Sequence, residues 1–359
     1  MFPLGTHFEE LLKNIRPPQE RFDAARDLPP LVRNYLRDHQ EFVTLAPHSR
    51  LVGSYAQDLS AGDVKDVDFL VRVDGDPSQN KPEAKQLIRN LKKVLDGLPA
   101  ALGYVGVAGI DIARARRSVH VYFQGHDFHL DVVPCIAPHG FAEVIYVPDR
   151  GFNTWIASHP VGYIQLLSTL HNEHGQKIRP LAKLVKHFRN YHMKTRQPKS
   201  YWLGALLVHH LRRDNGLDTS QPLAVLFRDL LDAIYRQYDH LLYVSTSATP
   251  NIPDPLLGHN ISWNWGRSHF ETFMRRLDDG RTWATKALDS PTKAEAIQWW
   301  QRVFGEAYFP ADVAAAASAL AAAGLPGRSY VTSAGLIAPT LPRAGMHTPV
   351  QRTTFHGQA

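Results

Sequence analysis

The sequence predicts an α+β fold, with a mixed β-sheet joined to a second lobe made of helices. Two observations support this prediction: strand-like segments occur before about residue 165, and amphipathic helical segments follow one another after it. The length of 359 residues is enough for about two domains of ordinary size. We therefore expect a core domain at residues 1–165, a helical lobe at 166–310 and a C-terminal tail at 311–359.

The first part of the chain combines helical segments with apolar, β-branched strands. The segment Phe8–Leu36 has helical character, and we expect its proline pairs to break or kink the helix at Pro17-Pro18 and Pro29-Pro30. Val67–Val73 is typical of a buried strand, and apolar residues at helical spacing predict a helix within Pro82–Leu98. Two further strand-like segments around a turn predict a hairpin: Ser118–Phe123 and Phe128–Val133.

After about Tyr163 the sequence changes to a succession of amphipathic helices. The predicted helices are Ile178–His192, Tyr201–Arg213, Leu223–Tyr238, His269–Leu277 and Lys293–Phe304. Beyond Pro310 small residues dominate, and few charged or large apolar side chains remain. Because such a segment cannot bury enough apolar surface to offset the entropy of ordering it, we expect a mobile tail.

Charge and cysteine content narrow the class of protein. Lysine and arginine outnumber aspartate and glutamate by 40 to 34, which suits a protein that handles nucleotides and leaves nucleic-acid binding open. The single cysteine, Cys135, excludes an intramolecular disulfide and a cysteine-based zinc site, and we expect it to be a buried apolar residue. Without a secretory signal or an apolar run of roughly 20 residues, we expect a cytoplasmic protein without membrane association.

Three short motifs place acidic and phosphate-binding side chains in the predicted core. Gly53 and Ser54 precede a strand that begins with Asp66 and Asp68, and Asp131 lies in the second strand of the predicted hairpin. Because side chains alternate along a strand, Asp66 and Asp68 face the same side of the sheet. If the two strands are neighbours, three carboxylates converge.

Three carboxylates close together repel one another, and a bound divalent cation usually neutralises this repulsion. Mg²⁺ prefers such oxygen ligands together with substrate phosphates. Two ions about 3.5–4 Å apart can activate an attacking hydroxyl and stabilise a leaving pyrophosphate. Two acidic residues at a strand end, without further motifs, are usually only exposed to solvent. The combination of all three motifs instead predicts a catalytic site with two Mg²⁺ ions, or Mn²⁺, held by Asp66, Asp68 and Asp131.

The order and spacing of these motifs resemble those of polymerase-beta-like nucleotidyltransferases, in which a Gly-Ser turn precedes an acid-x-acid strand and a third acid. Downstream motifs are similar to those of the oligoadenylate synthetases and of the cGAS/DncV-like nucleotidyltransferases (CD-NTases) of bacterial anti-phage signalling. These motifs are RPLAKLVKHF at 179–188, Lys199-Ser200-Tyr201, Asp254-Pro255 with Asn260, and the aromatic segment from Trp299 to Phe309-Pro310. The resemblance covers about residues 40–310 and implies two lobes with a central cleft.

The resemblance also implies a role for each acid in the core. Asp66 and Asp68 would ligate both metal ions. Asp131 would help to bind the catalytic ion and would draw the proton from an attacking 2′- or 3′-hydroxyl. Gly53 and Ser54 would hold the donor phosphates, since a glycine allows close backbone approach and a serine can donate a hydrogen bond.

In the helical lobe the resemblance implies three nucleotide-binding residues. Lys186 would pair with the triphosphate, Ser200 would add a phosphate hydrogen bond, and Tyr201 would stack on a base. Two places depart from the family pattern. Residues 57–59 do not match the loop that usually follows the Gly-Ser turn, and Gly204 stands where relatives often carry an acid or a base.

The function implied by the resemblance is synthesis of a cyclic or short linear oligonucleotide second messenger from NTPs, ATP among them, with release of pyrophosphate. The product would act on an effector protein. The chain end at Ala359 suits conjugation by a ubiquitin-like conjugating partner, as in some members of the family. Two alternatives stay open: a CCA-adding or poly(A)-like enzyme that extends RNA ends, and a catalytically silent nucleic-acid-binding module.

We expect the remaining histidines and the arginine run before residue 118 to have no role in binding a metal ion or a nucleic acid. The zinc element of the vertebrate DNA sensor of this superfamily uses cysteines that this chain lacks, so we do not expect histidines such as His187 and His192 to hold zinc. Arg114, Arg116 and Arg117 form a basic run, which we expect to be a solvated loop rather than a nucleic-acid contact.

Overall fold

The computed structural model describes residues 2, 4–61, 66–104, 109–195, 197–214, 216–244 and 246–311, and two short strands at 330–331 and 337–338. The side chain of Asp66 lies outside this description. The chain divides into two compact units, Met1–Phe309 and Pro310–Ala359. In the second unit the described strands β8 (Tyr330–Val331) and β9 (Ile337–Ala338) pair antiparallel. The predicted mobility of the tail and the conjugation site at its end fall outside the described residues.

A mixed sheet forms the centre of the first unit, as the sequence predicts. Its strands are β1 (Ser49–Val52), β2 (Asp66–Val73), β3 (Ile110–Arg114), β4 (Val119–Phe123), β5 (Phe128–Ile136), β6 (Ile145–Asp149) and β7 (Thr154–Ser158). The strand order is β1-β2-β5-β4-β3, and β6 pairs with β5 and β7. Strands β2 and β5 are parallel and the other pairs are antiparallel. The strand at 67–73 and the hairpin are both confirmed.

Helices cover the sheet and bury its apolar side chains. The elements in this part are α2 (Gln19–Asp38), α3 (Gly53–Ala56), α4 (Ala84–Leu95), α5 (Leu98–Ala101) and the 3₁₀ turns η1 (Pro77–Gln79) and η2 (Gln124–His126). The predicted break at Pro17 and Pro18 is confirmed, because α1 ends at Asn14 and α2 begins at Gln19, whereas α2 runs through Pro29 and Pro30 without a break. An interior proline costs about 3 kcal/mol, and the burial of Leu28, Val32 and Leu36 at about 1.5–3 kcal/mol each offsets that loss.

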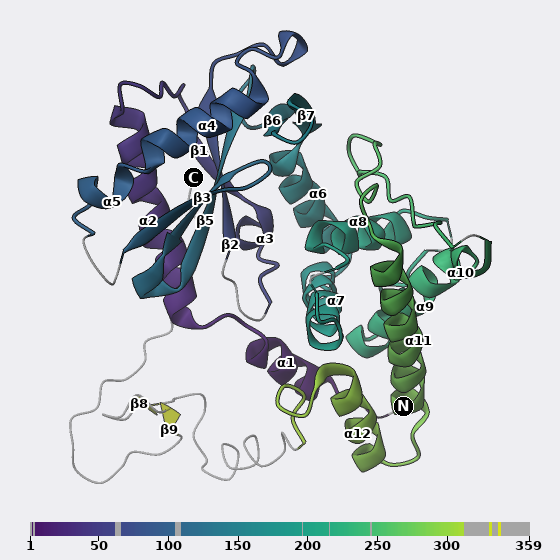
Figure 1. Cartoon of the computed structure of the whole chain (residues 1–359). Helices are drawn as coiled ribbons and strands as arrows, with labels where there is room; N and C mark the ends of the chain where they lie inside the picture. Colours follow the sequence, from purple (N-terminus) through teal and green to yellow (C-terminus); the bar gives the residue numbers. More distant parts are fainter. Residues whose placement is uncertain are drawn as a thin grey trace, which may run out of the picture. The chain divides into compact units, whose positions relative to one another are not determined.

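The second part of the unit is a bundle of helices (Figure 1). They are α1 (Gly5–Asn14), α6 (Pro160–Glu173), α7 (Ile178–His192), α8 (Ser200–Leu211), α9 (Leu223–Tyr238), α10 (Leu241–Val244), α11 (Arg267–Asp289) and α12 (Lys293–Phe304). The bounds of α7, α9 and α12 are those predicted, whereas α11 is longer than the predicted His269–Leu277. Its additional turns carry Arg281 and Lys286 among buried Gly280, Ala284 and Ala287, so the apolar periodicity is weak there.

Helix α1 packs with the helical bundle, although the predicted boundary at residue 165 places it with the sheet. Phe8 meets the ring of Trp300 edge to face, with 5.0 Å between the ring centroids. Phe8 and Leu11 belong to the same buried cluster as the apolar residues of α7, α9 and α12. The division of residues 1–310 into two domains stays a prediction, because the chain from Met1 to Phe309 is one compact unit.

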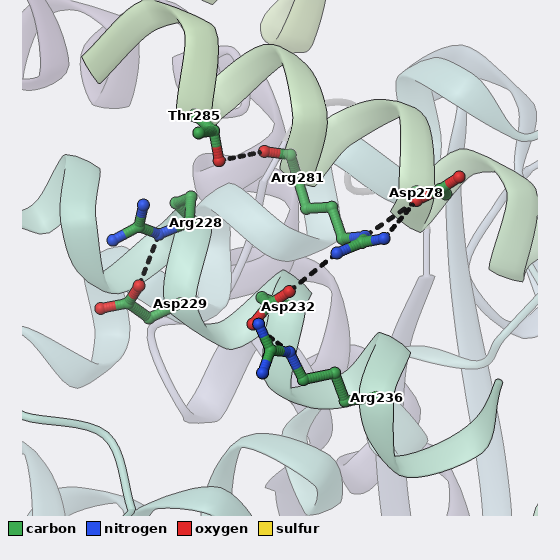
Figure 2. Close-up of polar contacts among 7 residues, drawn as sticks. All are labelled: Arg228, Asp229, Asp232, Arg236, Asp278, Arg281 and Thr285. Carbon is green, nitrogen blue, oxygen red and sulfur yellow. Dashed lines mark hydrogen bonds and ion pairs between the residues drawn. The ribbon is translucent and has the colours of Figure 1, made fainter. Parts of the chain in front are cut away.

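An ion-pair network joins α9 to α11 on the surface of the bundle (Figure 2). Asp232 of α9 forms ion pairs with Arg236 of the same helix at 2.7 Å and with Arg281 of α11 at 2.9 Å. Arg281 also pairs with Asp278 at 2.7 Å, and its guanidinium lies over the Tyr235 ring. These contacts supplement the apolar packing between the two helices.

Two histidines of the bundle, the buried His187 and the partly buried His192, have structural partners. His187 Nε2 donates to the Phe304 carbonyl at 2.9 Å, and His192 Nε2 donates to the Val303 carbonyl at 2.8 Å. Burial lowers the pKa of both rings, so both are neutral donors. Cys135 is fully buried, as predicted, and burial raises the pKa of its thiol to about 12. Within the described ranges, no helix is long and apolar enough to cross a membrane.

Candidate active site

The sheet places Asp68 and Asp131 side by side. In the parallel pair β2 and β5, Asp68 is the direct register partner of Asp131, and Asp66 is that of His129 two residues earlier. The expectation that the two acid-bearing strands are neighbours is therefore confirmed. Within the described ranges, no three His, Cys, Asp or Glu side chains are grouped closely enough to hold a metal ion. The side chain of Asp66 is not among them.

The Gly-Ser turn lies directly against one of these carboxylates. Val52 pairs with Asp68 at the end of β1, and α3 begins at the next residue, Gly53. Gly53 has a φ of +73°, and a Cβ built on it would lie 2.0 Å from Asp68 Oδ2. A glycine is required on both counts, because a side chain would be strained by the backbone and would collide with the carboxylate. Ser54 is thereby placed at the first turn of α3, beside the acids.

A cavity of about 600 Å³ collects the predicted residues of both lobes. Those that line it are Gly53, Ser54, Asp68, Asp131, Lys186, Ser200 and Tyr201. The lining also includes Lys199 of the Lys-Ser-Tyr motif and residues to which the sequence assigned no role, among them Tyr163, Arg189 and Asn190. Elements of the sheet supply the acids and the Gly-Ser turn, and α7 and α8 supply the remainder.

The residues that depart from the family pattern connect α3 to α7. Asp58 forms an ion pair with Lys183 of α7 at 2.9 Å, and the Leu59 carbonyl accepts a hydrogen bond from Lys186 Nζ at 3.4 Å. Gln57 lines the cavity. The loop after the Gly-Ser turn thus positions the lysine-bearing helix, and Lys186 Nζ lies at the cavity wall.

A buried arginine that sequence reasoning missed holds Ser200 in place. Arg189 is 1% exposed, and its guanidinium donates to Ser200 Oγ at 2.9 Å and to the Pro198 carbonyl. Its Nε donates to Asn190 Oδ1 at 2.7 Å. Arg189 lies three residues after Lys186 on α7, and this helical spacing is the sequence signal that could have identified it.

The Tyr201 ring is anchored through its hydroxyl. Tyr201 donates to Asp254 Oδ2 at 2.8 Å, and Asp254 Oδ1 accepts from the backbone amides of Leu256 and Leu257 at 2.9 and 3.0 Å. Burial, the hydrogen bond to Asp254 and its negative charge raise the pKa of Tyr201 well above its usual value. The hydroxyl therefore stays protonated as a donor. The Asp-Pro motif accordingly builds a turn that fixes this aromatic ring.

A second cavity of about 480 Å³ adjoins the first. Asp131, Lys199 and Tyr201 line both cavities. His120 lines the second cavity and is the register partner of Asp131 across β4 and β5, and its Nδ1 contacts Asp131 Oδ1. The Asp131 carboxylate thus stands where the two cavities meet.

The basic run lies at the edge of the second cavity: Arg114 is the last residue of β3, and the half-exposed Arg116 follows it in a loop, as expected. Arg116 Nε contacts both oxygens of the fully buried Asp149 at 2.9 Å. Its guanidinium carbon lies 4.8 Å from the Phe152 ring centroid and 5.3 Å from that of Trp263. Arg117 lies 3.6 Å from Asp149 and also lines the second cavity. A buried acid far along the chain thus orders this segment.

Known proteins resemble this chain in sequence and fold. Residues 3–170 match the Second Messenger Oligonucleotide or Dinucleotide Synthetase domain. A cyclic AMP-AMP-AMP synthase of Acinetobacter sp. is 25% identical over 311 residues, which cover 84% of each chain. The structure of Escherichia coli MS115-1 CdnC with ATP has a TM-score of 0.63 at 18% identity, covering 85% of this chain and 98% of that one. The structure of Bradyrhizobium diazoefficiens CdnG with GTP has a TM-score of 0.64 at 17% identity, covering 86% of this chain and 96% of that one.

These matches agree with the geometry of the site. The fold of the solved CD-NTases extends over both the sheet and the helical bundle of this chain. The matched domain contains the Gly-Ser turn, the acid-bearing strands and most of α6. Polymerase-beta-like nucleotidyltransferases of this kind are generally metal-dependent. Residues 3–170 carry the Second Messenger Oligonucleotide or Dinucleotide Synthetase domain, and the chain is a nucleotidyltransferase that makes cyclic oligonucleotide second messengers from NTPs.

Proposed function

We propose that this nucleotidyltransferase joins ATP, alone or with a second nucleotide, at the cavity bounded by Asp68 and Asp131, with two Mg²⁺ ions as cofactor. The observation that carries the proposal is the register pairing of these two acids beside Gly53 and Ser54. The Acinetobacter relative is named for a product made of AMP units, and the solved E. coli CdnC binds ATP. Both facts favour ATP as a substrate here.

The donor set suits Mg²⁺. The ion usually takes one or two protein carboxylates and completes its octahedron with water and substrate phosphates. Asp68 and Asp131 supply such oxygens, and Asp66 is the third acid proposed to hold the ions. When bound, the ions would polarise the α-phosphate and neutralise charge on the leaving pyrophosphate.

The side chains of the cavity divide the remaining tasks. Ser54 donates to the donor phosphates, while Gly53 leaves room for the Asp68 carboxylate beside them. Lys186 neutralises part of the triphosphate charge, and the Ser200 hydroxyl, held by Arg189, adds a hydrogen bond. Asp131 accepts the proton of the attacking hydroxyl.

The second cavity suits the nucleotide that carries the attacking hydroxyl. It shares Asp131 with the first cavity, so a hydroxyl offered from that side reaches the same carboxylate. Arg117 and Lys199 line it and can balance phosphate charge, and the half-exposed Trp263 ring offers a stacking surface. Burial and the charges of Arg117 and Arg116 lower the pKa of Lys199, as expected where cations gather to meet an anion.

Incubation of the purified chain with radiolabelled NTPs and Mg²⁺ tests the proposal. We expect pyrophosphate release and a phosphatase-resistant product whose bases and linkage are identified by chromatography and mass spectrometry. Asp68→Asn and Asp131→Asn should abolish product formation while the thermal midpoint stays within a few degrees of the wild type. His139→Gln, at an exposed site, serves as the control. Full activity in either acid variant would refute the proposed metal ligands, and extension of an RNA primer would assign the acids to a different reaction.

A further inference from the structure

The cavity has an apolar part that is distinct from its acidic end. One face of α8 contributes Ser200, Leu203, Gly204 and Leu207 in turn, at the spacing of a helix. Apolar residues of neighbouring helices complete this part of the wall: Ala182, Val185 and Leu230. An apolar wall suits the flat face of a nucleobase, whereas the triphosphate belongs with the acids, their metal ions and Lys186. This argument rests on the proposed function.

A tyrosine from α6 places a polar atom in this apolar region. Tyr163 is 2% exposed and lines the cavity, and among the described residues its hydroxyl has no hydrogen-bond partner. Buried tyrosine hydroxyls usually find a partner, because an unpaired polar atom loses its hydration without compensation. Burial raises the pKa of Tyr163 well above its usual value, so this hydroxyl is neutral and can both donate and accept.

Gly204 makes room for that hydroxyl. A Cβ built on Gly204 would lie 2.2 Å from the Tyr163 hydroxyl oxygen, so the oxygen occupies the place that a side chain at position 204 would take. Gly204 itself lines the cavity. The Tyr163 hydroxyl thus lies against the cavity-lining Gly204, where α8 has no side chain of its own.

The neighbouring Tyr201 indicates where the nucleobase would lie relative to the Tyr163 hydroxyl. The Tyr163 and Tyr201 rings meet edge to face, with 4.8 Å between centroids and 70° between planes. Tyr201 is fixed by Asp254, keeps 36% of its surface exposed and lines the cavity, so its ring is accessible to a base. A base stacked there would have its edge near Gly204, one helical turn further along α8.

We propose that Tyr163 determines base recognition: its hydroxyl forms a hydrogen bond with the edge of the nucleobase stacked on Tyr201. Gly204 is the companion residue that leaves space for this contact. The ligand class is the heterocyclic base of a nucleoside triphosphate, and the triphosphate itself does not contact Tyr163. Both residues act in specificity and neither takes part in the chemical step.

The test is the Tyr163→Phe variant of the full chain, with two probes measured by calorimetry in the presence of Mg²⁺. The first probe is a non-hydrolysable ATP analogue and the second is inorganic tripolyphosphate, which lacks the base. We expect affinity for the analogue to fall about five- to tenfold, the usual effect of one hydrogen bond, and tripolyphosphate affinity to stay unchanged. The thermal midpoint without ligand should stay equal or rise, because an unpaired buried oxygen has been removed. A purely structural tyrosine would instead lower it.

Two further variants sharpen the test. Tyr238→Phe alters another buried tyrosine of the helical core, which does not line the cavity, and should leave both affinities unchanged. Gly204→Ala should weaken binding of the analogue, because its methyl group displaces the Tyr163 hydroxyl. In the double variant Tyr163→Phe/Gly204→Ala, the clashing oxygen is gone, so the loss should not exceed that of Tyr163→Phe alone.

The outcomes separate the two proposals. Wild-type affinity for the analogue in Tyr163→Phe, or equal weakening of analogue and tripolyphosphate, would overturn the assignment of Tyr163 to the base. If the wild-type chain neither binds the analogue nor turns over NTPs, then the proposed function itself fails. Additive losses in the double variant would show that Gly204 acts independently of Tyr163 and would overturn its companion role.

Discussion

Gly53 lies so close to Asp68 that a side-chain carbon on residue 53 would stand 2.0 Å from the carboxylate oxygen Oδ2. The closeness follows from the sheet, because the preceding residue, Val52, is the register partner of Asp68. The Gly-Ser turn and the acid-x-acid strand are therefore one structural unit, in which the backbone that would hold a phosphate touches the side chain that would hold a metal ion.

We expect Gly53→Ala to abolish nucleotidyl transfer. The new methyl group must push the Asp68 carboxylate aside, and a φ of +73° adds backbone strain of roughly 1–2 kcal/mol for any residue with a Cβ. Pyrophosphate release with NTPs and Mg²⁺ measures the activity, and thermal denaturation measures the strain.

Gly140→Ala is the matched control for this variant. Gly140 has a φ of +81°, and a Cβ built there would meet nothing within 4 Å. It should lose similar stability through the backbone alone and keep full activity. If both glycine variants were active, or both inactive, the collision with Asp68 would not be the cause.

The bond between Tyr201 and Asp254 should matter for both stability and substrate binding. Tyr201→Phe removes the donor to a buried carboxylate, so we expect a loss of about 1.5–3 kcal/mol in the free energy of unfolding. The freed ring is also less well oriented for stacking, and KM for ATP should rise several-fold. Chemical denaturation and steady-state kinetics measure the two effects. Tyr243→Phe, at a tyrosine that is 81% exposed, should change neither quantity.

The ion-pair network between α9 and α11 should stabilise the bundle without affecting catalysis. Asp232→Asn weakens contacts with both Arg236 and Arg281, and we expect a loss of about 1 kcal/mol that shrinks as ionic strength rises. Asp229, on the same helix, pairs with the adjacent Arg228, and Asp229→Asn should cost less. Urea denaturation at low and high salt measures the difference. A loss for Asp232→Asn that is independent of salt would contradict an electrostatic origin.

The sequence predicts those parts of the site whose geometry is local. Strand periodicity predicts one face for Asp66 and Asp68, and the two strand-like segments are neighbours that pair Asp68 with Asp131. Helical spacing likewise gives the bounds of α7 and with them the position of Lys186. Each of these inferences depends on residues within a few positions of one another, or on one pair of neighbouring strands.

The remainder of the site depends on contacts between distant segments. Arg116 is ordered by Asp149, and Tyr163 fills the space left by Gly204, 41 positions further along the chain. Local propensity carries no signal of such pairings. From the sequence alone, Gly204 suggests that a polar side chain for contacting the nucleotide is missing at this position. In the structure, the Tyr163 hydroxyl from α6 occupies the place of that side chain.

Acid should destabilise the helical bundle through His210. This ring is 3% exposed, and burial, with smaller contributions from the charges of Arg213 and His209, lowers its pKa to about 4. Because the pKa in the folded state lies below the unfolded value of about 6.5, the unfolded chain binds more protons at intermediate pH. The stabilisation from the neutral ring is thus fully present above pH 6.5 and is lost as the pH falls toward 4, by up to about 3 kcal/mol for this single group.

His210→Gln should therefore show a flatter dependence of unfolding free energy on pH between about 6.5 and 4 than the wild type. His139→Gln, at an exposed site, should follow the wild type. Parallel curves for His210→Gln and the wild type would mean that the His210 ring does not resist protonation in the folded protein.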